Sequence, residues 1–250
     1  MAEYSSIDDE AKRASASEAD MLIALGGDGT MLRVGRLGAF NSQPVLGINL
    51  GRLGFLMDVQ PQGWPGVMRR LLCGEYRLEE RLMLHVAHCQ NGVTLRAYEI
   101  LNELAISRGA VVRPIRLQTA VDETPLTTYV ADGLIAATPT GSTAYALAVG
   151  GPILAPEVKS ILLVPIAPHL CMDRALILPP ETVVEVTIRT DHQALFSADG
   201  QRSTPLQDQD VLRVRASEHV ARFVRMTPPT DFYKTLADRM VKNPTADKAK

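Results

Sequence analysis

The sequence predicts an α/β domain followed by a mostly antiparallel β domain, because its pattern of apolar runs changes once along the chain. Between about residues 19 and 74, strand-like apolar runs and helical segments are separated by glycine-rich loops. Between about residues 76 and 226, short β-branched or alternating runs recur between turn signals. The 250 residues, of which 46% are hydrophobic, are enough for two modest domains. We assign residues 1–77 and 226–250 to the α/β domain and residues 78–225 to the β domain.

The first strand of the α/β domain ends in a turn that is rich in glycine. The apolar run Met21-Leu22-Ile23-Ala24 leads into Leu25-Gly26-Gly27-Asp28-Gly29-Thr30. Glycine lacks the Cβ that would keep a ligand from the backbone, and consecutive amides in such a turn form a donor site for anions. A carboxylate there would repel phosphate, so we expect Asp28 to face a magnesium ion or to accept a proton from an attacking hydroxyl. The alternative is a tight turn in which Asp28 caps a helix that starts near Thr30.

A second strand and a helix complete the first part of this domain. Residues 44–50 read as a buried strand that runs into another glycine-containing loop, residues 51–55. Residues 66–72 have helical spacing, and Gly74 is well placed to end that helix. Open α/β sheets bind ligands in the loops that follow the carboxyl ends of their strands, so both glycine loops are candidate ligand sites.

The β domain is predicted from short apolar runs separated by turn signals such as Asn91-Gly92 and Asp199-Gly200. These runs are residues 82–87, 95–100, 115–121, 134–137, 161–164, 182–188, 194–196, 211–214 and 221–224. One helix is expected inside the domain, from near Ser142 to Gly150-Gly151. After Met226 we expect a short helix over residues 231–241 and then a polar, disordered tail.

A second loop has the same physical character as the first. An apolar run over residues 134–137 leads into Thr138-Pro139-Thr140-Gly141-Ser142-Thr143 and the start of the expected helix. Amides at a helix N-terminus and the helix dipole favour a bound anion, and Tyr145 is placed to stack on a base or to cap a ribose. An ordinary Ser/Thr helix cap is the alternative.

A third candidate element is the pair Asn102-Glu103, which we expect to end a strand over residues 98–101. An adjacent amide and carboxylate at a strand end can chelate a ribose diol, or they can simply fill a turn. From these two residues alone, the turn is favoured.

Composition and missing motifs exclude several classes of protein. No apolar stretch reaches the ~18 residues that span a bilayer, so we expect no membrane partner. The acidic N-terminus is unlike a secretion signal and the three cysteines are widely spaced, which favours the cytoplasm. A net charge of −2 gives no basis for nucleic-acid binding. His85 and His88 would face opposite sides of a strand, so no zinc site is expected. The phosphate-binding motif that ends in Gly-Lys is absent.

In combination, the motifs resemble those of the NAD kinase family in order and approximate spacing, over roughly residues 18–226. They are Gly-Gly-Asp-Gly-Thr at 26–30, Asn-Leu-Gly-Arg-Leu-Gly-Phe at 49–55, Asn-Glu at 102–103, Asp-Gly at 132–133, Thr-Pro-Thr-Gly-Ser-Thr-Ala-Tyr at 138–145, Gly-Gly-Pro at 150–152, Pro-His at 168–169 and Asp-Gly-Gln at 199–201. The first motif is shared with diacylglycerol- and sphingosine-type lipid kinases and, loosely, with phosphofructokinases. The string at 138–145 is far more selective for NAD kinases.

The resemblance implies a Rossmann-like α/β nucleotide domain, a mostly antiparallel β domain that binds the dinucleotide, and a C-terminal segment that returns to the first domain. It implies transfer of a phosphoryl group from ATP, or from polyphosphate in some members, to the 2′-hydroxyl of the adenosine ribose of NAD, which gives NADP. Mg²⁺ or another divalent metal would accompany ATP. A homodimer or homotetramer is also implied.

Carried over by position, the resemblance assigns Asp28 as the proton acceptor and Phe55 as part of the adenosine pocket. Arg113 matches a contact position only by its distance from Asn102. No residue is assigned as a metal ligand. The full set of implied ligand-binding residues is Gly29, Arg33, Phe55, Asn102, Glu103, Arg113, Asp132, Thr143, Ala144, Tyr145, Ala148 and Gln201.

The chain departs from the family pattern in three places. About twenty residues precede the first strand, where members usually have a further strand and helix, so we expect a smaller sheet or a trimmed start. Residue 148 is alanine where serine is common, and residue 130 is valine where a basic residue is frequent. Two alternatives remain: a lipid or small-alcohol kinase of the same superfamily, and a non-catalytic NADP(H)-binding sensor. The sequence also leaves open NAD or NADH as acceptor and ATP or polyphosphate as donor.

Overall fold

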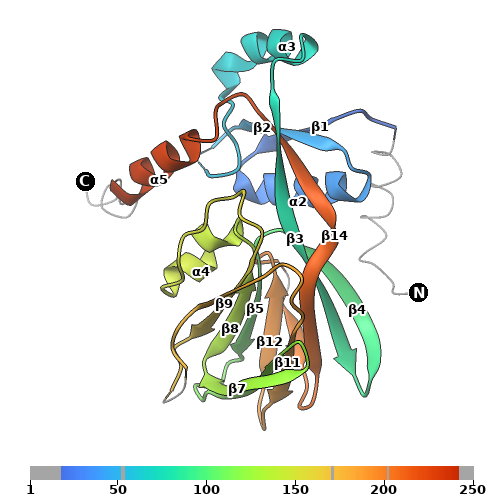
Figure 1. Ribbon diagram of the computed structural model, residues 1–250, viewed down its shortest axis with the longest axis vertical. Coiled ribbons are helices and arrows are strands. Elements are labelled where there is room, and N and C mark those ends of the chain that lie inside the picture. Colours follow the sequence, from blue (N-terminus) through green and yellow to red (C-terminus); the bar gives the residue numbers. More distant parts are fainter. Residues whose placement is uncertain (1–17, 52–53, 170–171, 202, 242–250) are drawn as a thin grey trace. The chain divides into compact units, whose positions relative to one another are not determined.

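The computed structural model describes residues 18–51, 54–169, 172–201 and 203–241. The described chain forms two compact units, an α/β unit of residues up to 80 and from 222 onward, and a β unit of residues 81–221 (Figure 1). Two long strands, β3 (Arg77–Gln90) and β14 (Val211–Arg225), contribute residues to both units. The start of the chain and the predicted polar tail lie outside the described residues.

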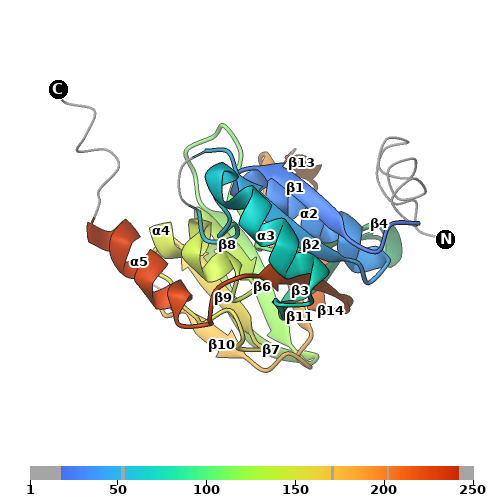
Figure 2. The ribbon, with the colours of Figure 1, turned by 90° about the horizontal axis from the view of Figure 1, so that it is seen from above.

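The α/β unit is built on parallel strands. Strand β1 (Leu22–Gly26) pairs with β2 (Pro44–Asn49), and β2 also pairs with the last residues of β14. Helices α2 (Asp28–Phe40) and α3 (Trp64–Leu72) lie on opposite sides of β1 and β2 (Figure 1), and α2 runs alongside β1 (Figure 2). The short helix η1 (Pro61–Gly63) precedes α3, and α5 (Asp231–Val241) follows β14.

Strand β2 is buried on both faces, which explains its nearly continuous apolar sequence. Leu46 and Ile48 cluster with Trp64 and other apolar side chains of α3. The intervening Gly47 faces α2, where an added Cβ would lie 3.0 Å from Met31 Sδ. Alternate residues of one strand therefore pack against different helices, as the period of two requires.

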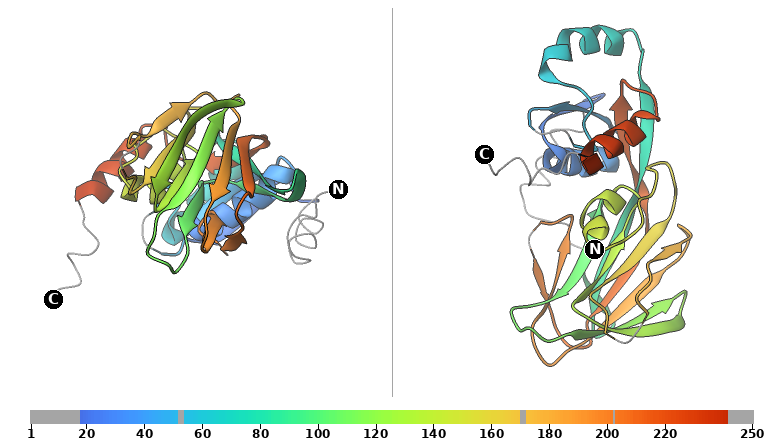
Figure 3. Two further views of the ribbon diagram at one scale, coloured as in Figure 1. Left: turned by 90° about the horizontal axis from the view of Figure 1, so that it is seen from below. Right: turned by 90° about the vertical axis from the view of Figure 1, so that its left-hand side faces the viewer.

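The β unit consists of antiparallel pairings in two sheets. One contains β3, β4, β6, β7, β11 and the first part of β14, and the other has the order β10-β9-β8-β5-β12-β13 (Figure 3). The remaining strands are β4 (Val93–Ile100), β5 (Glu103–Arg108), β6 (Ile115–Val121), β7 (Thr124–Ala131), β8 (Gly133–Ala137), β9 (Ile161–Ile166), β10 (Leu176–Leu178), β11 (Val184–Arg189), β12 (Ala194–Ala198) and β13 (Thr204–Leu206).

The core of the β unit lies between these sheets. Leu104, Leu134 and Phe196 belong to one large buried cluster to which both sheets contribute. The other face of β8, with Ile135, packs against Ala146 of the short helix α4 (Tyr145–Ala148). Strand β8 is therefore buried on both faces, and α4 lies at the end of β8 and β9 (Figure 3).

The predicted fold class is confirmed: a parallel α/β unit is combined with antiparallel β sheets, and β14 carries the chain back to the α/β unit. The runs 211–214 and 221–224 are one strand rather than two, because polar residues in its middle interrupt the apolar pattern. The helix expected over 142–151 is wrong in extent. It consists of a 3₁₀ turn, η2 (Gly141–Thr143), and the four-residue α4, with a break at Ala144. No described helix is long and apolar enough to cross a bilayer.

Candidate active site

Asp28 is held by the loop that follows β2. Its Oδ2 accepts a hydrogen bond from the amide of Phe55 at 2.8 Å, and its Oδ1 accepts one from the amide of Leu56 at 3.2 Å. Asp28 is itself the first residue of α2, and Gly27 is the N-cap. The alternative in which Asp28 caps a helix starting near Thr30 is therefore wrong, because the helix begins two residues earlier and the carboxylate bonds a different segment.

Gly54 allows this loop to approach the carboxylate. A Cβ built on Gly54 would lie 1.9 Å from Asp28 Oδ1, far inside ordinary contact distance. Any other residue at this position would displace either the loop or Asp28. Glycine is thus required at position 54 because a larger residue would collide with Asp28. In the sequence, Gly54 is recognisable only as part of a glycine-rich motif.

The start of α2 leaves backbone donors for a ligand. The amides of Thr30 and Met31 bond the carbonyl of Gly27, whereas the amides of Asp28 and Gly29 precede the first possible intrahelical acceptor. Apart from the adjacent residues and the backbone of α2 itself, no described atom lies within 4 Å of the position that a Cβ on Gly27 or Gly29 would occupy. A phosphate can therefore approach the backbone here, where the helix dipole also favours negative charge.

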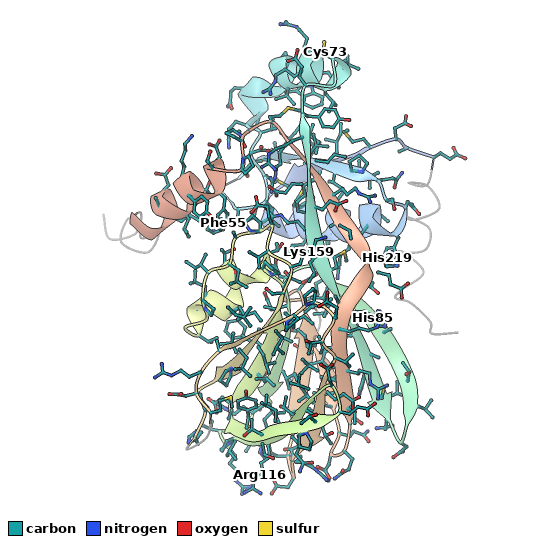
Figure 4. The ribbon with its side chains drawn as sticks, viewed as in Figure 1. Phe55, Cys73, His85, Arg116, Lys159 and His219 are labelled. Carbon is teal, nitrogen blue, oxygen red and sulfur yellow. The ribbon has the colours of Figure 1, made fainter. Side chains whose placement is uncertain are left out.

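Phe55 contacts helix α5 of the same unit (Figure 4). The guanidinium carbon of Arg239 lies 4.5 Å from the centroid of the Phe55 ring, and the centroid of Phe232 lies 6.0 Å away. The ring is half-buried. Arg239 and Phe232 were not identified from the sequence, because no motif connects the C-terminal helix with this loop.

A buried ion pair also holds the loop that contains Leu56. Arg225 on β14 donates two hydrogen bonds to Glu79 Oε1, at 3.0 and 2.8 Å, and a third to the carbonyl of Leu56 at 2.7 Å. Both charged side chains are almost fully buried. Since Leu56 also donates its amide to Asp28, a single residue links the ion pair to the proposed proton acceptor.

In the β unit, Asn102 and Glu103 lie where the chain passes from one sheet to the other. Strand β4 ends at Ile100 and β5 begins at Glu103, so the pair joins two strands rather than ending one. The carboxylate of Asp199 accepts hydrogen bonds from the amides of Leu101 at 3.1 Å, Asn102 at 2.6 Å and Glu103 at 3.3 Å. Asp199 belongs to the Asp-Gly-Gln motif, but nothing in the sequence indicates that it binds these amides.

Glu103 has the most strongly perturbed acidity in this region. Its side chain is 6% exposed, and Oε2 has no hydrogen-bond partner among the described residues. Burial, with a smaller contribution from the charge of Asp199, raises the pKa of Glu103 to about 7. The group therefore changes protonation near neutral pH, which is common for residues at functional sites.

The Thr138–Thr143 loop packs against the Asn102 turn. Thr138 Oγ1 donates to the carbonyl of Leu101 at 2.6 Å, and Ser142 Oγ donates to the carbonyl of Pro139 at 2.6 Å. An added Cβ on Gly141 would lie 2.2 Å from the carbonyl oxygen of Asn102. These two hydroxyls shape the loop itself, and the helix expected from near Ser142 to Gly150-Gly151 consists only of η2 and the four-residue α4.

Asp132 lies at the opposite end of β8 from Thr138. Its carboxylate forms an ion pair with Arg108, with Nε and Oδ1 2.9 Å apart, and Arg108 also bonds the carbonyl of Val111. Arg113 is exposed, with its Nη1 3.5 Å from Asp191 Oδ2. The structure thus places Asp132 and Arg113 away from the Asn102 turn, by roughly the 17 Å length of a five-residue strand.

The other predicted residues are accessible. Gln201 follows Asp199 in its turn, and its amide bonds the carbonyl of Ala198 at 3.0 Å. Arg33 is exposed on α2 and lies about 140° around the helix from Asp28. Four predicted residues in or between η2 and α4 are exposed or half-buried: Thr143, Ala144, Tyr145 and Ala148.

The two histidines that suggest a metal motif have separate partners. His85 Nδ1 lies 2.7 Å from Glu99 Oε1, and His88 Nε2 lies 2.8 Å from Asp210 Oδ2. Within the part of the chain that the structure describes, no group of three or more His, Cys, Asp or Glu side chains is arranged to hold a metal ion.

Comparison with known proteins connects both units to one family. Residues 2–76 match the model of the ATP-NAD kinase N-terminal domain, and residues 101–226 match that of the C-terminal domain. An NAD kinase from Heliobacterium modesticaldum is 40% identical over 222 residues, which cover 88% of this chain and 78% of that protein. An NAD kinase from Chloroflexus aggregans is also 40% identical, over 90% of this chain and 81% of its own.

Solved structures agree with this result. A yeast NADH kinase complexed with NADH has a TM-score of 0.84 at 28% identity, covering 92% of this chain and 69% of its own. An NAD kinase from Archaeoglobus fulgidus in complex with ATP has a TM-score of 0.73 at 26% identity, and the match covers 88% of this chain and 84% of that chain. The chain therefore belongs to the ATP-NAD kinase family and has the activity of an NAD kinase, the ATP-dependent phosphorylation of NAD to NADP.

Proposed function

We propose that Asp28 is the proton acceptor of this reaction. The 2′-hydroxyl oxygen of the adenosine ribose attacks the terminal phosphoryl group of ATP, and Asp28 removes the hydroxyl proton. The observation that supports this role is the fixed position of the carboxylate, which two loop amides hold in an otherwise glycine-lined turn. Among the described residues each carboxylate oxygen accepts one hydrogen bond, which leaves it a lone pair with which to accept a proton.

The amides at the start of α2 are proposed to bind the phosphates of ATP. Developing negative charge on the transferred group is stabilised by donors that are already in position, and the helix dipole adds to this effect. Mg²⁺ is usually held by one or two carboxylates together with the phosphates, and Asp28 is the carboxylate that this glycine-rich turn offers. When bound, the metal would neutralise part of the phosphate charge.

The β unit is proposed to supply the contacts to NAD. Three segments of this unit adjoin one another. The loop before Thr143 and Tyr145 lies next to the Asn102-Glu103 turn, because Gly141 packs on Asn102. The turn before Gln201 lies next to it as well, because Asp199 accepts a hydrogen bond from the amide of Asn102. Asp132 and Arg113 would bind a different part of the ligand, since they lie at the other end of β8.

A homodimer or homotetramer is proposed because the family resemblance implies it, and a cytoplasmic location is proposed because the three cysteines are widely spaced. Sedimentation velocity of the full chain measures the first directly. A single species with the mass of one chain, 27.2 kDa, would contradict it.

Substitution of Asp28 by Asn tests the proposed mechanism. General-base catalysis contributes about 10²–10⁴ in rate, so Asp28→Asn should lower kcat by that factor and leave the Kd for NAD within a few fold. Formation of NADP from Mg-ATP and NAD is the assay for kcat, and calorimetry gives the Kd. The control is Asp231→Asn, which removes an acid that also begins a helix, α5. Near-normal kcat in Asp28→Asn would contradict the role of Asp28.

A further inference from the structure

The backbone amides of the turn formed by Leu101, Asn102 and Glu103 all bond the same side chain. Three consecutive backbone amides converge on the carboxylate of Asp199, at a distance of 96 to 98 residues along the sequence. Such a run of amides forms a concave donor site for an anion. Here the anion is supplied by the protein itself.

We propose that Asp199 is the positioning residue that presents Asn102 and Glu103 to the dinucleotide, and that it acts without contacting the ligand. The proposal rests on the proposed function of these two residues as NAD contacts. It assigns to Asp199 a role in NAD binding that is separate from phosphoryl transfer at Asp28.

The hydrogen bonds of Asn102 support this assignment. Its amide donates to Asp199, and its carbonyl accepts a hydrogen bond from the amide of Thr138 at 2.8 Å. Both backbone groups of Asn102 are thus in use, so the side-chain amide is its remaining group for recognising a ligand. The direction of that side chain is set by a backbone whose position depends on Asp199.

Asp199 is in turn fixed by the segment that it holds. Its own amide donates to the carbonyl of Glu103 at 2.9 Å, so the two segments bond each other reciprocally. Asp199 is 9% exposed and has a φ of 51°, a left-handed conformation that Asp and Asn tolerate better than most residues. Because Asp199 is buried, its carboxylate is shielded from solvent and has little surface with which to contact a bound molecule.

The test is Asp199→Asn, which preserves side-chain size and the tolerance for positive φ but replaces one acceptor oxygen by a donor. Hydrogen bonds to a charged acceptor are stronger than those to a neutral one, so the neutral Asn should hold the Asn102 turn less firmly. The KM for NAD should therefore rise roughly tenfold. The KM for ATP should stay within twofold, and kcat should fall much less than in Asp28→Asn. A general loss of folded protein would instead lower kcat without a selective change in one KM.

Two companion variants sharpen the test. Asp122→Asn is the matched control, because Asp122 also has positive φ, 47°, and accepts a backbone hydrogen bond, from Val183 at 2.8 Å, in a distant turn. Its kinetic constants should equal those of the wild type. Asp199→Glu keeps the charge but moves it by one methylene, and it should also raise the KM for NAD. If Asp199→Asn does not fold, the KM for NAD of Asp199→Glu is the measurement that tests the proposal.

The outcomes separate this inference from the proposed function. If Asn102→Ala raises the KM for NAD while both Asp199 variants leave it unchanged, the positioning role is overturned and the NAD site stands. If Asn102→Ala itself has no effect on the KM for NAD, the proposed NAD site is wrong. A parallel loss of kcat and of affinity for both substrates in the Asp199 variants would also overturn the inference, because it would indicate general structural damage.

Discussion

Replacing Gly54 by alanine should disable catalysis through steric displacement of Asp28. The added Cβ would stand 1.9 Å from Asp28 Oδ1, whereas ordinary contact begins at 3.4 Å, so the loop or the carboxylate must move by about 1.5 Å. A displacement of 1 Å in a reacting group can cost about 10²-fold in rate. We therefore expect Gly54→Ala to lower kcat by about 10²-fold, at the lower end of the loss expected for Asp28→Asn.

The assay is the rate of NADP formation with saturating Mg-ATP and NAD, with the midpoint of urea unfolding measured on the same samples. The matched control is Gly66→Ala in α3, where no described atom outside the adjacent residues and the backbone of α3 lies within 4 Å of the added Cβ. That change should leave kcat unaltered and raise the free energy of unfolding by about 0.4–1 kcal/mol, because alanine has less conformational entropy to lose. A folded Gly54→Ala protein with kcat within threefold of wild type would refute the reasoning.

Two further predictions concern stability. Folding raises the pKa of Glu103 from 4.5 to about 7. Between these pH values the folded protein keeps a proton that the unfolded chain releases, so the free energy of unfolding falls as the pH rises from 4.5 to about 7. Glu103→Gln should remove that dependence and be more stable than wild type at about pH 8, by up to about 3 kcal/mol; an unchanged pH dependence of urea unfolding would contradict this. Arg225→Met removes both hydrogen bonds to Oε1 of the buried Glu79 and leaves it the pair with Arg77 at Oε2, so the change should cost about 3 kcal/mol, the lower end for a broken buried ion pair. Arg213→Met, at an exposed pair with Glu185, should cost at most about 1 kcal/mol in the same experiment, and equal losses would argue against the buried pair.

The sequence predicts the α/β unit well because its elements have distinct local patterns. Strand β2 is apolar on both faces, α3 has helical spacing, and glycine marks the loops between them. Strand β7, with the sequence Thr-Pro-Leu-Thr-Thr-Tyr-Val-Ala, was missed because its polar residues and proline resemble a loop. Its place in the sheet depends on pairing with β6, which is a tertiary interaction.

The candidate site could be predicted only as a set of residues. Motifs identified Asp28, Asn102 and Glu103, but not the atoms that hold them. The partners come from distant segments: Phe55 and Leu56 for Asp28, and Asp199 for the Asn102 turn. Arg225 gave no signal at all, since a single arginine near the end of an apolar strand is typical of a solvent-exposed position.

The two units use the same physical device at their proposed functional groups. In each, a carboxylate accepts hydrogen bonds from the backbone of a loop, and a glycine allows a second segment to pack closely at that point: Gly54 on Asp28, and Gly141 on the carbonyl of Asn102. Backbone donors do not depend on side-chain identity, so the residues that donate them carry little sequence signal. The close packing does leave a signal in the sequence, because only glycine, which has no Cβ, avoids a collision with the neighbouring segment. This explains why the glycines of the two loops locate the sites in the sequence, while the bonds that organise those sites appear only in the structure.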